Sequence, residues 1–408
     1  MSILKNDADK KPRNLLLLPT LLLGMFLLSS WTVFTGTLLK DIATSLGVSV
    51  GTASLLNLVL SIVSLFLGLA MGALSLRFRH KSLLLVGFAF IGVGGLGFYL
   101  APSFVIALVV SVVIGSGTGM VAIMTFSLIG ELLPLEKRGM AVGLAVSALM
   151  AAWVFIGPLA GFIGGAAGWR IIPVWFTFPL SMICLFLGFF AVPSGLSQER
   201  PPPKSVYAKA FKQILSNRSA NACLTSTFFV WLFNTVPLYA VTFYRISFLA
   251  SPQVAGTFGG IAAAGGMFGG VIGGRLVNQY GRKPLAVSAG IAAGAAAILF
   301  TYVPNIWVSL ALWVGSASSV AASGAASGSL ILEQVPEFRS SMMSLNNTFQ
   351  ALGGIAGVSI GALLLNLYTN NYQMVMTIFG VSGITSALVI LFLAKDICTP
   401  KPSSFQPS

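Results

Sequence analysis

Residues 82–130 read SLLLVGFAFIGVGGLGFYLAPSFVIALVVSVVIGSGTGMVAIMTFSLIG, a run of 49 residues without Asp, Glu, Lys or Arg. A helix needs about 20 apolar residues to cross a bilayer, because about 30 Å of hydrocarbon is spanned at roughly 1.5 Å per residue. The run is therefore too long for one membrane span and long enough for two. Pro102-Ser103, near its middle, has the turn chemistry that would separate them.

Eight more charge-free stretches extend this pattern along the chain. Two of them, 284–332 and 340–394, are also long enough for two spans, with turn residues at Pro304-Asn305 and Asn370-Asn371. The stretches that hold one span each are 14–39, 42–76, 139–169, 171–198, 219–244 and 246–274. A transmembrane barrel would instead show short segments of alternating hydrophobicity, and no such pattern occurs. The sequence predicts an all-α membrane protein with twelve transmembrane helices.

The basic residues predict how these helices are oriented. If both termini are inside, 20 of the 23 Lys and Arg residues lie on the inner side, and only Lys40, Arg170 and Arg245 lie outside. This distribution predicts a multi-pass protein of the plasma (inner) membrane with both termini cytoplasmic. The formal charge of +14 then reflects topology, so we expect no nucleic-acid partner.

A polar stretch in the middle of the chain marks the domain boundary. It opens with Pro201-Pro202-Pro203 and continues into an amphipathic pattern over 204–215 that predicts a short helix on the inner leaflet. The predicted organisation is an N-terminal six-helix bundle, a cytoplasmic linker, a C-terminal six-helix bundle and a cytoplasmic tail, at 1–193, 194–219, 220–396 and 397–408.

The two halves repeat each other at an offset of 202 residues. Six identical or similar pairs fall at two loops: Gly72 with Gly274, Lys81 with Lys283, Glu131 with Glu333, Pro134 with Pro336, Lys137 with Arg339, and Met140 with Met342. The repeat predicts two pseudo-symmetric bundles of six helices.

The first of these loops resembles the signature of the major facilitator superfamily, Gly-x-x-x-Asp-Arg-x-Gly-Arg-Lys/Arg. The first copy has Gly72, Arg77 and Lys81, and the second copy has Gly274, Gly281, Arg282 and Lys283. Both copies lack the acidic residue, since Leu76 and Asn278 stand at that position. In the family this Asp belongs to a charge network that holds the halves together on the inner side.

A second motif lies in the predicted fifth helix. Gly157-Pro158-Leu-Ala-Gly161 resembles the Gly-Pro-x-x-Gly motif of the twelve-helix drug and metabolite antiporters of that superfamily. Proline bends a helix and glycine permits close contact, so these residues are candidates for conformational exchange, with a kinked packing helix as the alternative. Helix 4 departs from the antiporter pattern, because Ser111 stands where that group usually has Arg.

Glycine rows with a spacing of four occur on helices 2, 5, 8 and 11, for example Gly353, Gly357 and Gly361. Rows of this kind permit close helix packing. The resemblance implies that these four helices meet at the boundary between the halves. Generic packing within a bundle is the alternative.

The resemblance also implies a central cavity lined by helices 1, 4, 7 and 10. No Asp, Glu, Lys or Arg lies in the central part of any predicted span, where ionisable residues mark proton relays and sites for charged substrates. Polar, aromatic and Met residues remain, which suits a small neutral or amphipathic solute. The candidate path residues are Trp31, Thr35, Met120, Met124, Trp231, Asn234, Tyr239, Ser319, Ser323, Asn346, Asn347 and Gln350.

These features favour a secondary transporter that exports its solute by alternating access. An uptake symporter or facilitator is the alternative, as is a membrane sensor or scaffold without transport. Asp41 is the candidate coupling residue if protons drive the carrier, because it is the only carboxylate predicted on the outer side. We expect a monomer in the lipid bilayer with a small-molecule substrate, no cofactor, no metal and no enzymatic activity.

Overall fold

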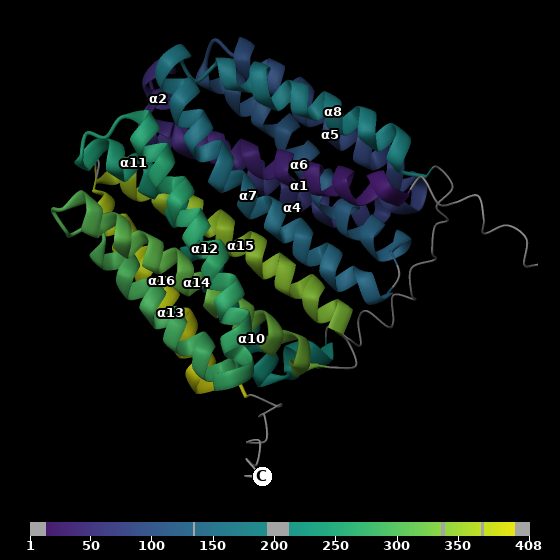
Figure 1. The fold of residues 1–408 in the computed structure, drawn as a ribbon, viewed down its shortest axis with the longest axis vertical. Helices are drawn as coiled ribbons and strands as arrows, with labels where there is room; N and C mark the ends of the chain where they lie inside the picture. The colour runs from purple at the N-terminus through teal and green to yellow at the C-terminus, as the bar shows by residue number, and fades with distance from the viewer. Residues whose placement is uncertain (1–13, 134, 194–211, 336–338, 369–370, 396–408) are drawn as a thin grey trace, which may run out of the picture. The chain divides into compact units, whose positions relative to one another are not determined.

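The computed structural model describes residues 14–133, 135–193, 212–335, 339–368 and 371–395, and within them it is helical, without strands (Figure 1). Twelve helices in this part of the chain are long and apolar enough to cross a membrane. The predicted fold class and the number of spans are therefore confirmed.

The described part of the first half has nine helical segments, because Leu39–Ser45 is a separate short helix after the first span, Val50–Ala53 begins the second span and Pro173–Thr177 begins the sixth. They are α1 Asn14–Thr37, α2 Leu39–Ser45, α3 Val50–Ala53, α4 Leu55–Arg77, α5 His80–Leu100, α6 Phe104–Leu132, α7 Leu135–Ala167, the π-helical turn η2 Pro173–Thr177, and α8 Phe178–Ala191. Those of the second half are α10 Arg218–Phe233, α11 Val236–Ser247, α12 Pro252–Tyr280, α13 Arg282–Leu299, α14 Ile306–Gln334, α15 Arg339–Leu367 and α16 Tyr372–Leu393.

The turns that divide the long apolar runs contain residues that begin the next helix. The Asn305 side chain accepts a hydrogen bond from the backbone N–H of Trp307 at 2.9 Å. Asn371 accepts one from Met374 at 3.0 Å, and Ser103 makes a longer contact of 3.5 Å with Ile106. These N-caps satisfy backbone donors that have no partner within the helix, which explains why the predicted turns interrupt the runs at these positions.

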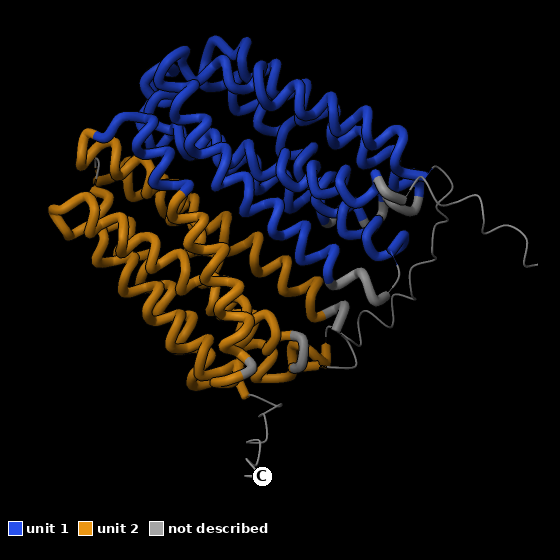
Figure 2. Tube along the Cα trace, viewed as in Figure 1, with its two compact units in different colours: residues 1–200, 250–260 blue, residues 201–249, 261–408 orange. Residues whose placement is uncertain are grey.

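The chain forms two compact units (Figure 2), which we describe separately. Unit 1 contains residues 1–200 and 250–260, and unit 2 contains residues 201–249 and 261–408. The helix α12 thus contributes its first turns to unit 1 and the remainder to unit 2.

The helices of both units pack in the same pattern. In unit 1, α1 packs against α7, and α5 packs against α6 and α8; in unit 2, α10 packs against α15, and α13 packs against α14 and α16. Each pair in one unit is related to the corresponding pair in the other by the sequence repeat. The shared packing supports the interpretation of the chain as a duplicated six-helix unit.

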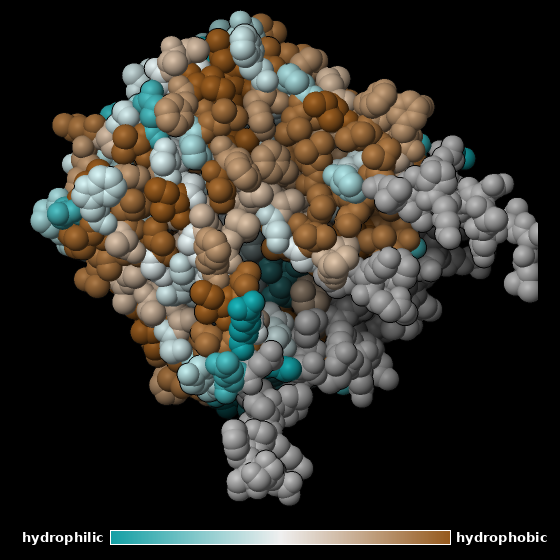
Figure 3. Space-filling view, viewed as in Figure 1, coloured by the Kyte–Doolittle hydropathy of each residue, from teal (hydrophilic) through white to brown (hydrophobic). Residues whose placement is uncertain are grey.

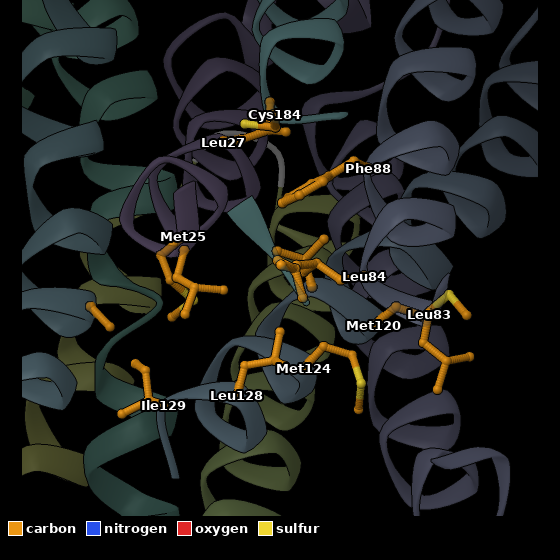
Figure 4. Close-up of a cluster of buried hydrophobic side chains, with 14 of the residues drawn as sticks. Met25, Leu27, Leu83, Leu84, Phe88, Met120, Met124, Leu128, Ile129 and Cys184 are labelled. Carbon is orange, nitrogen blue, oxygen red and sulfur yellow. The ribbon is translucent and has the colours of Figure 1, made fainter. Parts of the chain in front are cut away.

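Each unit has an apolar interior. Figure 4 shows part of the cluster in unit 1, where Met25, Phe88 and Met124 are at most 1% exposed. The aromatic core of unit 2 includes Tyr244 and Trp313, whose rings stack at 5.6 Å. Apolar side chains also cover much of the surface in Figure 3, as expected for helices that contact lipid. Phe66, Phe186 and Phe392 belong to this exposed set.

The linker prediction is only partly within the described residues, because 194–211 lies outside them. Ile214, on the apolar face of the predicted amphipathic helix, is fully buried and belongs to a core cluster of unit 2 together with Leu224 and Val335. At this position the apolar face contacts protein and not the lipid leaflet.

Candidate functional site

The candidate path residues of the first half are buried in the interior of unit 1. Trp31 is 1% exposed and contacts Phe98 edge-on, with 5.0 Å between the ring centroids. The Thr35 hydroxyl lies 2.9 Å from the Trp31 carbonyl and 3.0 Å from Asn57 Oδ1, and either oxygen can accept its proton. Met120 and Met124 belong to the apolar cluster of Figure 4. In this conformation all four residues pack against their own unit.

Three candidates of the second half are also engaged inside their unit. The Tyr239 hydroxyl donates to the Val358 carbonyl at 2.9 Å, and Ser323 donates to the Ala286 carbonyl at 2.9 Å. Asn346 accepts a hydrogen bond of 2.8 Å from Thr227. These bonds connect neighbouring helices, which is the usual role of small polar groups inside membrane bundles.

The remaining candidates are accessible. Trp231 is 39% exposed although it lies in the middle of an apolar span, and Asn234 and Asn347 are exposed as well. Ser319 and Gln350 are half-buried. We call Trp231, Asn234, Asn347 and Gln350 the α10–α15 residues, after the helices that carry or adjoin them.

The helix break that follows Trp231 accounts for the position of Asn234. The seventh span divides into α10, which ends at Phe233, and α11, which begins at Val236 with Pro237 in its first turn. Proline has no backbone N–H, so the carbonyl of Phe233 cannot receive the usual bond from four residues ahead. Substrate sites of secondary transporters occur at such discontinuous helices.

The glycine row of α15 brings this helix against the broken span. A Cβ at Gly353 would lie 3.0 Å from the Trp231 Cβ and would overlap the Phe228 carbonyl. One turn further, a Cβ at Gly357 would lie 2.6 Å from the Thr235 side chain. The α10–α15 residues thus come from two segments in close contact within unit 2, and none of them carries a charge.

The contacts of the glycine rows bear on the two alternatives for their role. The row of α15 packs within unit 2, and so do Gly265, Gly269 and Gly273 of α12, which face α14. In the row of helix 2, a Cβ at Gly68 would lie 3.1 Å from Ile123 Cδ1 of the same unit. For these rows the contacts favour the alternative, generic packing within a bundle, because close crossings inside a bundle also require small residues.

The row of helix 5 behaves differently, since it faces the first turns of α12. A Cβ at Gly157 would lie 3.0 Å from the Gly256 carbonyl oxygen. A Cβ at Gly161 would overlap the Pro252 carbonyl oxygen and lie 3.1 Å from the Gln253 Cα. Pro158, within α7, lies next to Gly260. The Gly-Pro-x-x-Gly motif therefore forms a backbone-to-backbone contact with the segment of α12 that belongs to unit 1.

The two signature loops make equivalent contacts in the two units. Lys81 donates to the Phe189 carbonyl at the end of α8, and Lys283 donates to the Ala394 carbonyl after α16 at 2.8 Å. A cation near a helix C-terminus is stabilised by the helix dipole and satisfies a free carbonyl. Gly281 precedes α13 with φ +86°, a conformation that favours glycine.

The other signature residues occupy the adjoining helix ends. Gly72 lies within α4 and Gly274 within α12, each in the last two turns of its helix. Arg77 ends α4 and is exposed, whereas Arg282 begins α13 and is half-buried. Asp41 lies in the first turn of α2 and is half-buried.

The distribution of basic residues assigned Arg245 to the outer side of the membrane and did not predict its burial. Arg245 lies in the last turn of α11 and is only 7% exposed. Its burial could have been predicted from the sequence. The helical pattern continues without a break from Pro237 through Tyr244, so Arg245 belongs to the same packed helix. Its position near the helix C-terminus favours a cation.

A comparison of the sequence with models of protein families shows the family of this chain. The model of the Major Facilitator Superfamily matches residues 20–273 and, in a second match, residues 223–407. The chain belongs to the major facilitator superfamily. Membership makes it a transporter and not an enzyme, as predicted.

Solved structures of this superfamily share the fold. A D-xylose–proton symporter aligns with a TM-score of 0.77 at 18% identity, covering 94% of this chain and 98% of the symporter. The inward-open xylose transporter XylE from E. coli gives 0.74 at 17%, covering 95% and 97%. The nucleoside transporter NupG gives 0.74 at 13%, covering 92% and 99%. At these identities the similarity establishes the fold of this superfamily member and nothing about its substrate.

Proposed function

We propose that this transporter moves a small neutral or amphipathic solute by alternating access and that it exports the solute from the cytoplasm. The observation that carries the proposal is the uncharged character of the α10–α15 residues beside the broken seventh span. An indole, two amides of asparagine and one of glutamine offer an apolar surface together with hydrogen-bond donors and acceptors. Such a set would recognise an uncharged ring or polar group and would not compensate a bare charge.

The positions of the charged residues support the same substrate class. The helices place their Lys, Arg, Asp and Glu residues within about two turns of a helix end, as with Asp41, Glu131 and Arg275. A charged solute would therefore meet no countercharge in the middle of the spans. An isolated charge there costs about 2.5–3.5 kcal/mol on insertion scales.

The direction of transport is inferred from the Gly157-Pro158-x-x-Gly161 motif, which resembles that of the drug and metabolite antiporters. Its close contact with the first turns of α12 is consistent with a conformational role. Uptake by symport or facilitation is the second candidate, because a D-xylose–proton symporter is among the proteins of the same fold.

The orientation in the membrane is testable by cysteine labelling. We expect a Cys at Ser205, which lies outside the described residues, to be protected from a membrane-impermeant reagent in intact cells. A Cys at Asn371, the N-cap of α16, should react. This result follows from the inner location of the basic segments, and the reverse pattern of labelling would contradict the proposed topology.

Proton coupling through the protein is tested at Asp41. We expect Asp41→Asn to change transport less than about fivefold, because the half-buried carboxylate lies at a helix end and interactions of partly exposed charges are worth at most about 1 kcal/mol, a factor of about five. The measurement is flux into proteoliposomes with and without an imposed pH gradient. Gradient-driven flux of a non-ionisable solute that disappears in Asp41→Asn would show that Asp41 carries the coupling proton.

A further inference from the structure

His80 is the only histidine of the chain, and it begins α5 in the first signature loop. Its Nδ1 lies 2.8 Å from Oε1 of Glu131, and the two side chains are 13% and 27% exposed. The carboxylate oxygen lies off the direction of the ring N–H, since Nδ1 has no aligned hydrogen-bond partner. The contact is therefore an electrostatic pairing that depends on the charge of the imidazole.

Each of the two charged groups lies at the end of its helix where the helix dipole disfavours its charge. His80 is the first residue of α5, where the dipole disfavours a cation, and Glu131 lies in the last turn of α6, where it disfavours an anion. Each group therefore relies on the other for stabilisation. When the imidazole is neutral, the Glu131 carboxylate remains at the negative end of α6 without its cation.

The repeat shows that this position is not equivalent in the two halves. At the offset of 202 residues, His80 corresponds to Arg282 and Glu131 corresponds to Glu333. An arginine is charged at every physiological pH, whereas a histidine side chain changes its charge between about pH 5 and 8. The second half thus has an arginine where the first half has a histidine.

Other charged groups also lie at this end of unit 1. The described cationic side chains are Arg77, Arg79 and Lys81, and Lys81 is bound to the Phe189 carbonyl. Glu131 is the carboxylate that the structure places against His80. The sequence adds Glu136, Lys137 and Arg138 at the start of α7, whose side chains are outside the described set.

We propose that His80 and Glu131 form a proton-dependent clasp between α5 and α6 that makes the inner end of unit 1, and not that of unit 2, sensitive to pH. The clasp is closed when the imidazole is protonated and opposes the Glu131 carboxylate, and it loosens when the imidazole is neutral. Only the identity of the compartment that is sensed, the cytoplasm, rests on the proposed function.

The experiment is hydrogen–deuterium exchange of the purified full-length protein in nanodiscs at pH 5.5 and pH 8. Backbone amide exchange is followed in the segments around His80 and Glu131 and corrected for the intrinsic effect of pH on exchange. The corrected rates are compared among wild type, His80→Arg, His80→Gln and Glu131→Gln. We expect wild type to lose protection about two- to fivefold at pH 8, the size of a partly exposed ion pair. His80→Arg should keep its protection at both pH values, and His80→Gln and Glu131→Gln should lack it at both.

The segment around Arg282 serves as an internal control, because it should keep the same protection in all samples. Equal responses of wild type and His80→Arg, or a wild type whose protection does not change with pH, would overturn the proposal. A change of similar size around Arg282 would also overturn it, because the effect would then be global. The measurement needs no substrate, so a failure of the proposed transport activity would be seen separately, as absence of flux.

Discussion

Gly161→Leu is expected to leave the transporter folded and able to bind its ligand while its turnover falls about tenfold or more. The added side chain would meet the backbone of Pro252 and Gln253, which cannot move aside as a flexible side chain can. Overpacking of this kind costs about 1–3 kcal/mol, and about 1.4 kcal/mol corresponds to a factor of ten in rate. The substitution should therefore disfavour the conformation in which α7 and α12 are in contact.

Turnover would be measured as flux in proteoliposomes, and ligand binding as a thermal shift of the purified protein. Gly143→Leu is the matched control, since Gly143 lies on the same helix and a Cβ there would meet nothing within 4 Å. Loss of folding in Gly161→Leu, or the same turnover in both variants, would contradict a conformational role for the motif.

Trp231→Ala and Asn234→Ala are expected to raise KM about ten- to a hundredfold with a smaller change in kcat. Removal of an indole deletes a large apolar contact, and removal of an amide leaves a polar group of the substrate without its partner. Effects that appear in KM indicate interactions present already in the ground-state complex. The measurement is the concentration dependence of flux in proteoliposomes.

Trp175→Ala is the control for a general effect of losing a tryptophan. Trp175 is 73% exposed and lies in η2 of unit 1. Equal changes in Trp175→Ala and Trp231→Ala, or no change in Trp231→Ala and Asn234→Ala, would remove the α10–α15 residues from the proposed path.

The fold could be predicted because it depends on two strong sequence features, the long uncharged apolar runs and the residues that begin each helix. Uncharged runs of 26 residues or more leave no alternative to membrane spans, and residues such as Asn305 and Asn371 begin the following helices with side-chain caps. The repeated Lys81 and Lys283 also proved equivalent, since each binds a carbonyl at the end of the last helix of its half.

The candidate site could be predicted less well because residue type does not determine which side of a helix is accessible. Trp31 and Trp231 are both tryptophans in the middle of a span, yet one is 1% and the other 39% exposed. Trp31 packs on Phe98, whereas Trp231 lies next to Gly353, which has no side chain to cover it. Such differences depend on the helix that lies opposite, which a single sequence does not specify.

Counterflow in proteoliposomes tests most directly whether this member of the superfamily carries an uncharged solute. Vesicles that contain wild type or Gly161→Leu would be preloaded with members of a panel of neutral, cationic and anionic compounds, and entry of the labelled compound would be followed without any ion gradient. We predict saturable counterflow of one or more neutral or amphipathic compounds in wild type, strongly reduced in Gly161→Leu. Counterflow restricted to ionic compounds, or none for the entire panel by folded protein, would contradict the account.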